Sequence, residues 1–129
     1  MDNGSNQQPA TVVVVEDDSH ISYVLQFMLA REGFQVIVLE DGLQAKRLIE
    51  QSDPPKLVLL DIMLPHENGF QLIDHIRNKP SWHDVPIVML TARSQERDIT
   101  RALNAGANDY VIKPFRPQEL MARIRRLVN

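Results

Sequence analysis

The chain alternates short apolar stretches with longer amphipathic ones, and this alternation limits its possible folds more than any other feature. The apolar stretches are rich in Val, Ile and Leu, as expected of strands covered on both faces of a sheet. We predict five strands, at residues 11–16, 35–39, 56–60, 86–90 and 110–112. Strands and helices that alternate in this way form a parallel sheet with right-handed crossovers. The predicted fold class is therefore α/β, a doubly wound five-stranded parallel sheet.

Each predicted strand is followed by a segment with apolar residues at helical spacing. In the first segment these residues are Ile21, Val24, Leu25, Met28 and Leu29. Gly33 suits the end of that helix, and Asp41 suits the cap of the next one. The fourth helix is predicted from about Ser94 to Asn104. Pro117 falls in the first turn of the last helix, where its missing amide proton costs little.

Composition limits the class of protein. A chain of 129 residues suits one domain, which we place at residues 11–129, after a short disordered leader at residues 1–10. No cysteine is present, so disulfides and thiolate chemistry are excluded, and a cytoplasmic location is expected. The net charge of −3 argues against nucleic-acid binding, and no apolar run reaches membrane-spanning length.

Polar residues follow four of the predicted strands, at the edge where ligands collect in sheets of this kind. These residues are Glu16, Asp17 and Asp18 after the first strand, Asp61 after the third, Thr91 after the fourth and Lys113 after the fifth. We therefore expect a cluster of carboxylates with one hydroxyl and one ammonium group.

Such a cluster needs a cation, because two carboxylates about 4 Å apart repel by about 4 kcal/mol at an effective dielectric constant of about 20. Oxygen ligands favour a hard divalent ion, most naturally Mg²⁺. We predict that Asp17 and Asp61 bind it directly and Glu16 through water. We also expect Asp61 to be exposed in a crevice and to attack a phosphoryl group, whose oxygens Lys113 and Thr91 hold.

Each of these residues has a simpler interpretation when it is taken alone. The Glu-Asp-Asp run is typical of a helix cap, and an aspartate after a strand is typical of a turn. Thr91 is compatible with the start of a turn, and Lys113 with an ordinary solvated lysine. Their joint occurrence at four strand ends favours a site.

Four motifs carry a family resemblance: "VVVVEDD", "LVLLDIMLPHENGF", "PIVMLTA" and "GANDYVIKPF". Asp61 precedes Thr91 by 30 residues and Lys113 by 52. In this order and at these separations, the motifs resemble the receiver domains of two-component response regulators. The resemblance covers Thr11 to Val128 and implies the flavodoxin-like receiver fold.

The resemblance implies a role for each site residue. Asp61 resembles the phosphoacceptor, which takes a phosphoryl group from a phosphohistidine on a sensor histidine kinase or phosphotransfer protein. Glu16 and Asp17 resemble the acidic pair that serves Mg²⁺, with the Met63 carbonyl as a further ligand. Lys113 resembles the lysine that contacts the phosphoryl group, and its peptide bond to Pro114 is expected to be cis.

Two residues resemble the switch elements of the family. Thr91 resembles the hydroxyl that moves to the phosphoryl oxygens, and Tyr110 resembles the aromatic residue that rotates inward with it. A half-buried strand aromatic is an equally compatible interpretation of Tyr110. The change is expected to be read on the face formed by the fourth helix, fifth strand and fifth helix.

The same face resembles the dimer interface of receivers joined to winged-helix DNA-binding domains. The residues that fit its salt bridges are Arg101, Asp109, Glu119 and Arg123. Homodimerisation through this face is expected. The salt bridges are expected to be altered, because Asn108 stands where an aspartate is usual and Ile99 where a basic residue is usual.

His66 and Asn68 also depart from the glycine and aspartate that are usual in the family. We interpret His66 as a solvent-facing loop histidine; the alternative is that it tunes access to the crevice or the response to pH. Trp82 is interpreted as a loop aromatic over the sheet edge.

Three functions are compatible with these residues. The leading one is a signalling switch that controls an output domain or partner, in transcription regulation, and that catalyses only its own phosphorylation and dephosphorylation. The second is a pseudo-receiver, an interaction module independent of phosphate, although every site residue is present. The third is a phosphohydrolase with an aspartate nucleophile, which would need an acid two residues later, where this chain has Met63.

Overall fold

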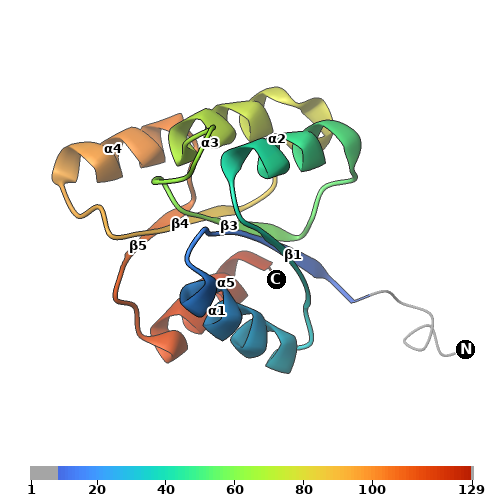
Figure 1. Ribbon diagram of the computed structural model, residues 1–129, viewed down its shortest axis with the longest axis vertical. Helices are drawn as coiled ribbons and strands as arrows, with labels where there is room; N and C mark the ends of the chain where they lie inside the picture. The colour runs from blue at the N-terminus through green and yellow to red at the C-terminus, as the bar shows by residue number, and fades with distance from the viewer. Residues whose placement is uncertain (1–8, 129) are drawn as a thin grey trace, which may run out of the picture.

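The computed structural model describes residues 9–128, so residues 1–8 of the predicted leader lie outside the described part of the chain. Five strands alternate with five α-helices over this range (Figure 1). The strands are β1 (Thr11–Val15), β2 (Gln35–Leu39), β3 (Leu57–Leu60), β4 (Ile87–Thr91) and β5 (Asp109–Ile112). The helices are α1 (Ser19–Arg31), α2 (Gly42–Gln51), α3 (Gly69–Asn78), α4 (Glu96–Ala105) and α5 (Pro117–Val128), with a 3-10 turn, η2, at Pro80–Trp82.

The strands form one parallel sheet in the order β2-β1-β3-β4-β5, which confirms the predicted fold class. Helices α1 and α5 cover one face, and α2, α3 and α4 cover the other (Figure 1). The chain reverses its direction of travel across the sheet between β1 and β3. The carboxyl ends of these two central strands therefore form the position where α/β proteins bind ligands.

The sheet divides the apolar core into two clusters, because successive residues of a strand point to opposite faces. Val13, Val15, Val58 and Leu60 pack against α2 and α3. Their neighbours in the same strands pack against α1 and α5 in the second cluster, which contains Val12, Val14, Leu57 and Leu59. All four residues of β3 are buried, which explains why this strand is an unbroken apolar run.

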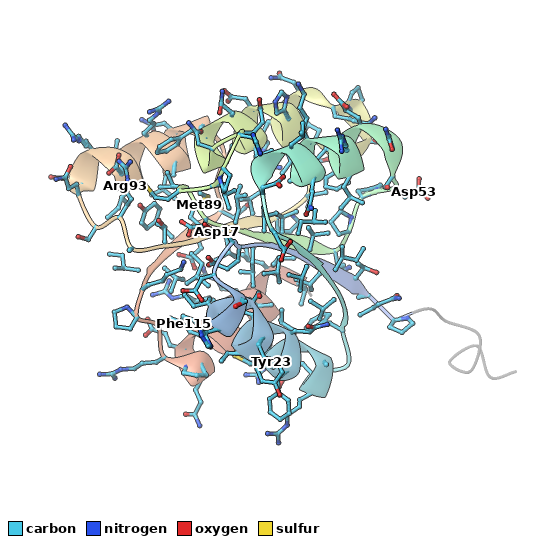
Figure 2. The ribbon with its side chains drawn as sticks, in the orientation of Figure 1. Asp17, Tyr23, Asp53, Met89, Arg93 and Phe115 are labelled. Atoms are coloured by element: carbon cyan, nitrogen blue, oxygen red, sulfur yellow. The ribbon has the colours of Figure 1, made fainter. Side chains whose placement is uncertain are left out.

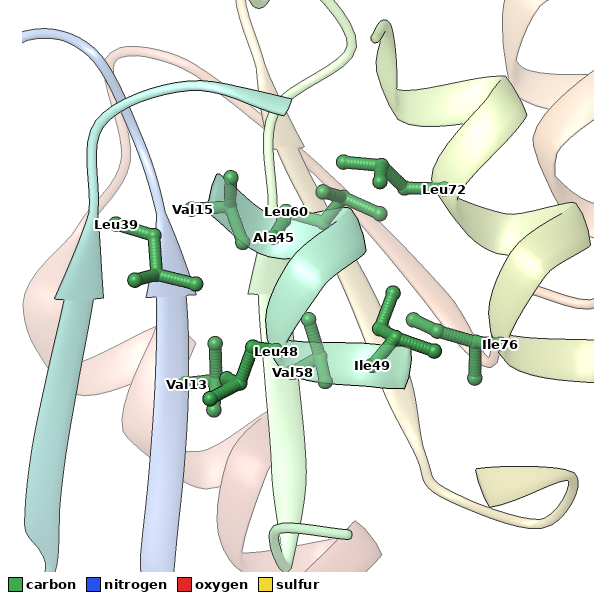
Figure 3. Close-up of a pocket in the computed structure, with 10 residues that line it drawn as sticks. All are labelled: Val13, Val15, Leu39, Ala45, Leu48, Ile49, Val58, Leu60, Leu72 and Ile76. Carbon is green, nitrogen blue, oxygen red and sulfur yellow. The ribbon is translucent and has the colours of Figure 1, made fainter. Parts of the chain in front are cut away.

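A small cavity lies between the sheet and helices α2 and α3 (Figure 3). Its volume is about 10 Å³, and all ten side chains that line it are apolar. A cavity without polar partners for water stays dry. We therefore interpret it as a packing defect of the core.

The helix ends agree with the predicted capping residues. Asp18 accepts hydrogen bonds from two amides at the start of α1, and Asp41 accepts one from Gln44 in α2. Gly33 has a φ of 94° and follows Glu32, the C-cap residue of α1, where a residue in the left-handed conformation commonly ends a helix. Helix α4 begins at Glu96 instead of near Ser94, and its cap residue Gln95 makes no side-chain hydrogen bond to the helix.

Arg77 ties together the amino end of the sheet and the last turn of α4. Its guanidinium donates to the carbonyl oxygens of His83, Val85 and Gly106, at 2.7–3.1 Å, and to Asn108 Oδ1 at 3.0 Å. Asn108 Oδ1 also accepts from the amide of Ile87, the first residue of β4. All of these acceptors are neutral.

Trp82 is more deeply placed than the sequence analysis suggested. It lies in η2, is 1% exposed, and donates from its indole nitrogen to the carbonyl oxygen of Ser52 at 2.9 Å. It therefore belongs to the core cluster on the α2–α3 face and not to a surface loop.

Candidate functional site

The carboxyl ends of β1, β3 and β5 bring three predicted residues into contact. Each of the three is the first residue after its strand: Glu16, Asp61 and Lys113. Lys113 Nζ lies 2.6 Å from Glu16 Oε1 and 2.9 Å from Asp61 Oδ2. The Lys113-Pro114 peptide bond is cis, as the resemblance implied. One ammonium group thus joins two carboxylates that are distant in sequence.

Three carboxylates gather at this point. Glu16, Asp17 and Asp61 each offer an oxygen, and these oxygens all lie within 4.8 Å of one another. Asp17 is exposed, whereas the other two are buried. A compact, oxygen-only donor set with one member open to water fits Mg²⁺, which prefers carboxylates and keeps several waters.

The expectation that Asp61 is exposed is wrong. Asp61 is 5% exposed and Glu16 is 2% exposed. Asp61 is accommodated because Lys113 pairs with Oδ2 and the Met63 amide donates to Oδ1 at 3.2 Å. The sequence predicted Lys113 in the same cluster, but it could not reveal how deeply Asp61 is buried, because burial depends on the packing of the neighbouring segments.

Burial and pairing change the acid–base properties of the cluster. Burial raises the pKa of Glu16, against the opposing hydrogen bonds from Lys113 and the amide of Asp18. Burial alone would lower the pKa of Lys113, but its hydrogen bonds to Glu16 and Asp61 outweigh this and leave that pKa raised. Lys113 is therefore a stable cation beside Asp61 at neutral pH.

Thr91 and Tyr110 lie on the side of the site that adjoins α4. Thr91 ends β4, is fully buried, and accepts a hydrogen bond from the amide of Arg93 at 3.3 Å. Tyr110 is half-buried, and its hydroxyl donates to the Arg93 carbonyl oxygen at 2.8 Å. Burial, followed by the charge of Asp98, raises the pKa of Tyr110 to about 12. The loop after β4 thus links both predicted switch residues.

Two charged residues that the sequence analysis did not single out also lie here. Arg93 contacts Met63 and Asp98, and Asp98 is 6% exposed in the first turn of α4. Arg93, Met63 and Asp17 line the same surface groove of about 430 Å³. Figure 2 shows Arg93 below α4 and Asp17 near the middle of the view, above α1. The sequence signal for Arg93 was only its position two residues after Thr91.

Three of the four predicted dimer-face residues contact one another within the chain. Arg123 NH1 lies 3.0 Å from both carboxylate oxygens of Asp109, and its NH2 lies 3.1 Å from Glu119. The fourth, Arg101, is placed apart from them, with its guanidinium carbon 3.9 Å from the ring centroid of Phe70 in α3.

The comparison with protein families decides the class of this molecule. The sequence pattern of the response regulator receiver domain matches residues 12–125. The chain belongs to the response regulator receiver domain family. Glu16, Asp17, Asp61, Thr91 and Lys113 all lie within the matched range of this receiver.

Similar proteins include regulators of transcription. The receiver is 43% identical over 118 residues to the phosphate regulon transcriptional regulatory protein PhoB of Escherichia coli, covering 92% of this chain and 51% of that protein. It is 45% identical over 114 residues to the DNA-binding response regulator MtrA of Mycolicibacterium paratuberculosis, covering 88% of this chain and 49% of that protein. The chain thus spans about half the length of these relatives.

Solved receiver structures share the fold. A putative response regulator from Chloroflexus aurantiacus superposes with a TM-score of 0.85 at 32% identity, over 94% of this chain and 98% of the other. The receiver domain of the sensor histidine kinase PA1611 from Pseudomonas aeruginosa has a TM-score of 0.84 at 33% identity, over the same shares of the two chains. That structure is described as having a magnesium ion coordinated in its active site cleft. Among residues 9–128 of the present chain, no helix is long and apolar enough to cross a membrane.

Proposed function

We propose that this receiver is a phosphorylation-dependent switch, and that Asp61 accepts a phosphoryl group from a phosphohistidine of a sensor kinase or phosphotransfer protein. The observation that carries the proposal is the Lys113 ammonium, 2.9 Å from Asp61 and 2.6 Å from Glu16. An Asp61 oxygen attacks phosphorus, the bond from phosphorus to the imidazole nitrogen breaks, and the electron pair stays on the imidazole. Lys113 then contacts the transferred oxygens.

We further propose that Asp17, Asp61 and the Met63 carbonyl hold Mg²⁺, with Glu16 acting through water. When bound, the ion neutralises charge on the phosphoryl oxygens. The three carboxylate oxygens within 4.8 Å support this assignment, and so does the magnesium-bound receiver from Pseudomonas aeruginosa. Asp17 is exposed, so the ion has access from solvent.

The output is proposed to pass through Thr91 and Tyr110 to the face of α4, β5 and α5. The shared link of both residues to the Arg93 backbone supports this route. We propose that this face controls transcription through an output domain or partner, as the names of the relatives suggest, and that it forms a homodimer. The reaction of the receiver is then limited to its own phosphorylation and dephosphorylation. Its cytoplasmic location stays a prediction.

The structure favours this function over the two alternatives. A phosphohydrolase needs an acid that protonates the leaving group, and the thioether side chain of Met63, two residues after Asp61, carries no acidic proton. A phosphate-independent module would not need Lys113 between two buried carboxylates, because apolar residues of similar volume often give equal or greater stability in place of a buried ion pair.

The test is intact-protein mass spectrometry after incubation with a small acyl phosphate and Mg²⁺. We expect the wild type to gain one phosphoryl group, and removal of Mg²⁺ by a chelator to prevent the gain. Asp61→Asn should gain none, whereas Asp53→Asn, which changes an exposed aspartate elsewhere, should react like the wild type. An unmodified wild type would favour the pseudo-receiver, and a modified Asp61→Asn would place the acceptor at another residue.

A further inference from the structure

Arg93 has an unusual set of contacts for a cation beside an acidic cluster. Its Nε donates to the sulfur of Met63 at 3.1 Å, and its NH1 lies 3.4 Å from Asp98 Oδ2. A thioether sulfur is a weak acceptor, and 3.4 Å exceeds the usual length of a charge-assisted hydrogen bond. The guanidinium is thus held near the site by weak contacts.

Met63 places this guanidinium close to the phosphoacceptor. The Met63 sulfur contacts Arg93, while the Met63 amide donates to Asp61 Oδ1 at 3.2 Å. Arg93 and Asp17 also line one groove. A phosphoryl group on Asp61 would therefore appear within the surroundings of Arg93 and would offer it three strong acceptor oxygens.

Asp98 depends on Arg93 for compensation of its charge. The Asp98 side chain is 9% exposed, and among residues 9–128 Arg93 is the one cation within salt-bridge distance of it. Asp98 lies in the first turn of α4, whose cap residue Gln95 makes no side-chain hydrogen bond. The amides of Asp98 and Ile99 both donate to the Gln95 carbonyl oxygen, at 3.0 and 3.2 Å. The start of this turn is thus held by backbone hydrogen bonds without a side-chain cap.

We propose that Arg93 is a cation that moves between Asp98 and the phosphoryl group, and that Asp98 is the positioning residue that opposes its transfer. Phosphorylation draws Arg93 to the stronger acceptors, and Asp98 is then left buried without a cation. An unpaired buried carboxylate is unfavourable, so the first turn of α4 opens until water reaches Asp98. This inference rests on the proposed function, since it requires a phosphoryl group on Asp61.

The same movement reaches Tyr110. The Tyr110 hydroxyl donates to the backbone carbonyl of Arg93, and Asp98 and Arg93 both contribute to the electrostatic surroundings of that hydroxyl. A change in the Arg93–Asp98 pair therefore acts on α4 and on β5 together. These are two of the three elements of the proposed output face.

The first experiment measures the affinity for fluoroberyllate, a phosphoryl analogue, by ¹⁹F NMR in the presence of Mg²⁺. Arg93→Gln should weaken binding about tenfold, the effect of one hydrogen bond between charged groups. Asp98→Asn should tighten binding about two- to fivefold, because it frees Arg93 from a partly exposed pair. Glu96→Gln removes the same charge from the same turn without a contact to Arg93, and should leave the affinity unchanged.

The combination of variants separates positioning by Asp98 from a general effect of its charge. In the Arg93→Gln background, Asp98→Asn should have no effect on fluoroberyllate affinity. Equal tightening by Asp98→Asn with and without Arg93 would overturn the proposal. So would tightening by Glu96→Gln that matches that of Asp98→Asn.

The second experiment follows hydrogen exchange at the amides of Asp98 and Ile99. In the wild type, fluoroberyllate with Mg²⁺ should accelerate exchange at both amides. In Arg93→Gln, both should exchange rapidly before the analogue is added, and the analogue should cause no further change. Slower exchange in the wild type on binding would overturn the proposal without any variant. A wild type that takes up neither phosphoryl group nor analogue would instead overturn the proposed function and this inference with it.

Discussion

His66 holds a backbone conformation that suits glycine better than histidine. Its φ is 72°, and among residues 9–128 it is the only residue other than glycine with a positive φ. The residue lies in the loop between β3 and α3, which also carries Met63, and its side chain is exposed. The left-handed conformation brings Cβ close to the following carbonyl oxygen and is unfavourable for L-residues. His66 therefore stores strain in the loop beside the acidic cluster.

We expect His66→Gly to raise the free energy of unfolding by up to about 1 kcal/mol, because the relief of strain exceeds the extra chain entropy of glycine. Urea denaturation at constant pH measures the difference. His83→Gly is the matched control, since His83 is also exposed but has a φ of −54°. The control should lower stability, and a stabilising His83→Gly together with a neutral His66→Gly would contradict the interpretation.

At the scale of elements, α3 and α4 begin in opposite ways. Helix α3 has a capping box, in which Asn68 Oδ1 accepts from the Gln71 amide at 3.0 Å and Gln71 Oε1 accepts from the Asn68 amide at 2.8 Å. Helix α4 has no side-chain cap at Gln95. Helix α3 thus has a side-chain cap at its N-terminus, whereas α4 has none.

Asn68→Ala should lower the free energy of unfolding by about 1 kcal/mol, because it removes the cap and leaves the Gln71 amide unpaired. Gln95→Ala should leave stability nearly unchanged, because its side chain makes no cap hydrogen bond. Thermal and urea denaturation of the two variants give the comparison. Equal losses at both positions would show that the difference between the two helix starts has no energetic consequence.

At the scale of the whole molecule, the sheet separates two clusters of buried apolar side chains, which have no residue in common among residues 9–128. Ile76 belongs to the cluster under α2 and α3, and Ile124 belongs to the cluster under α1 and α5. Both are at most 1% exposed. Changes of packing on one face therefore reach the other only through the backbone of the strands.

Ile76→Val and Ile124→Val should each lower the free energy of unfolding by about 0.5–1.5 kcal/mol, and their effects should add. Ile49→Val with Ile76→Val is the control pair, because both side chains line the cavity in Figure 3. Each substitution enlarges the same cavity, so the two effects on the free energy of unfolding should not add. A double-mutant cycle by urea denaturation measures both couplings. If the interaction energy between Ile76 and Ile124 were as large as that between Ile49 and Ile76, the interpretation of the two clusters as independent would be contradicted.

Much of this molecule was predictable from local patterns. The five strands follow from apolar runs, and their parallel order makes Glu16, Asp61, Thr91 and Lys113 converge at one edge whatever the details of packing. What the sequence could not supply are contacts that depend on the rotamers of long side chains. The contact of Arg93 with Met63 and the placement of Arg101 over Phe70 both join residues from different elements. No spacing along the chain predicts them.

The acceptors around Arg77 are neutral, and this makes its hydrogen bonds independent of acid. Burial lowers the pKa of Arg77, but a guanidinium stays charged at any pH that proteins tolerate. Its partners are three carbonyl oxygens and the Asn108 amide, and none of them takes up a proton. Acidification therefore leaves these hydrogen bonds intact, whereas at the opposite end of the strands it protonates Glu16, whose pKa is raised by burial. An aspartate at position 108 would be a titratable partner for Arg77, whereas the Asn108 amide keeps this hydrogen bond independent of protonation.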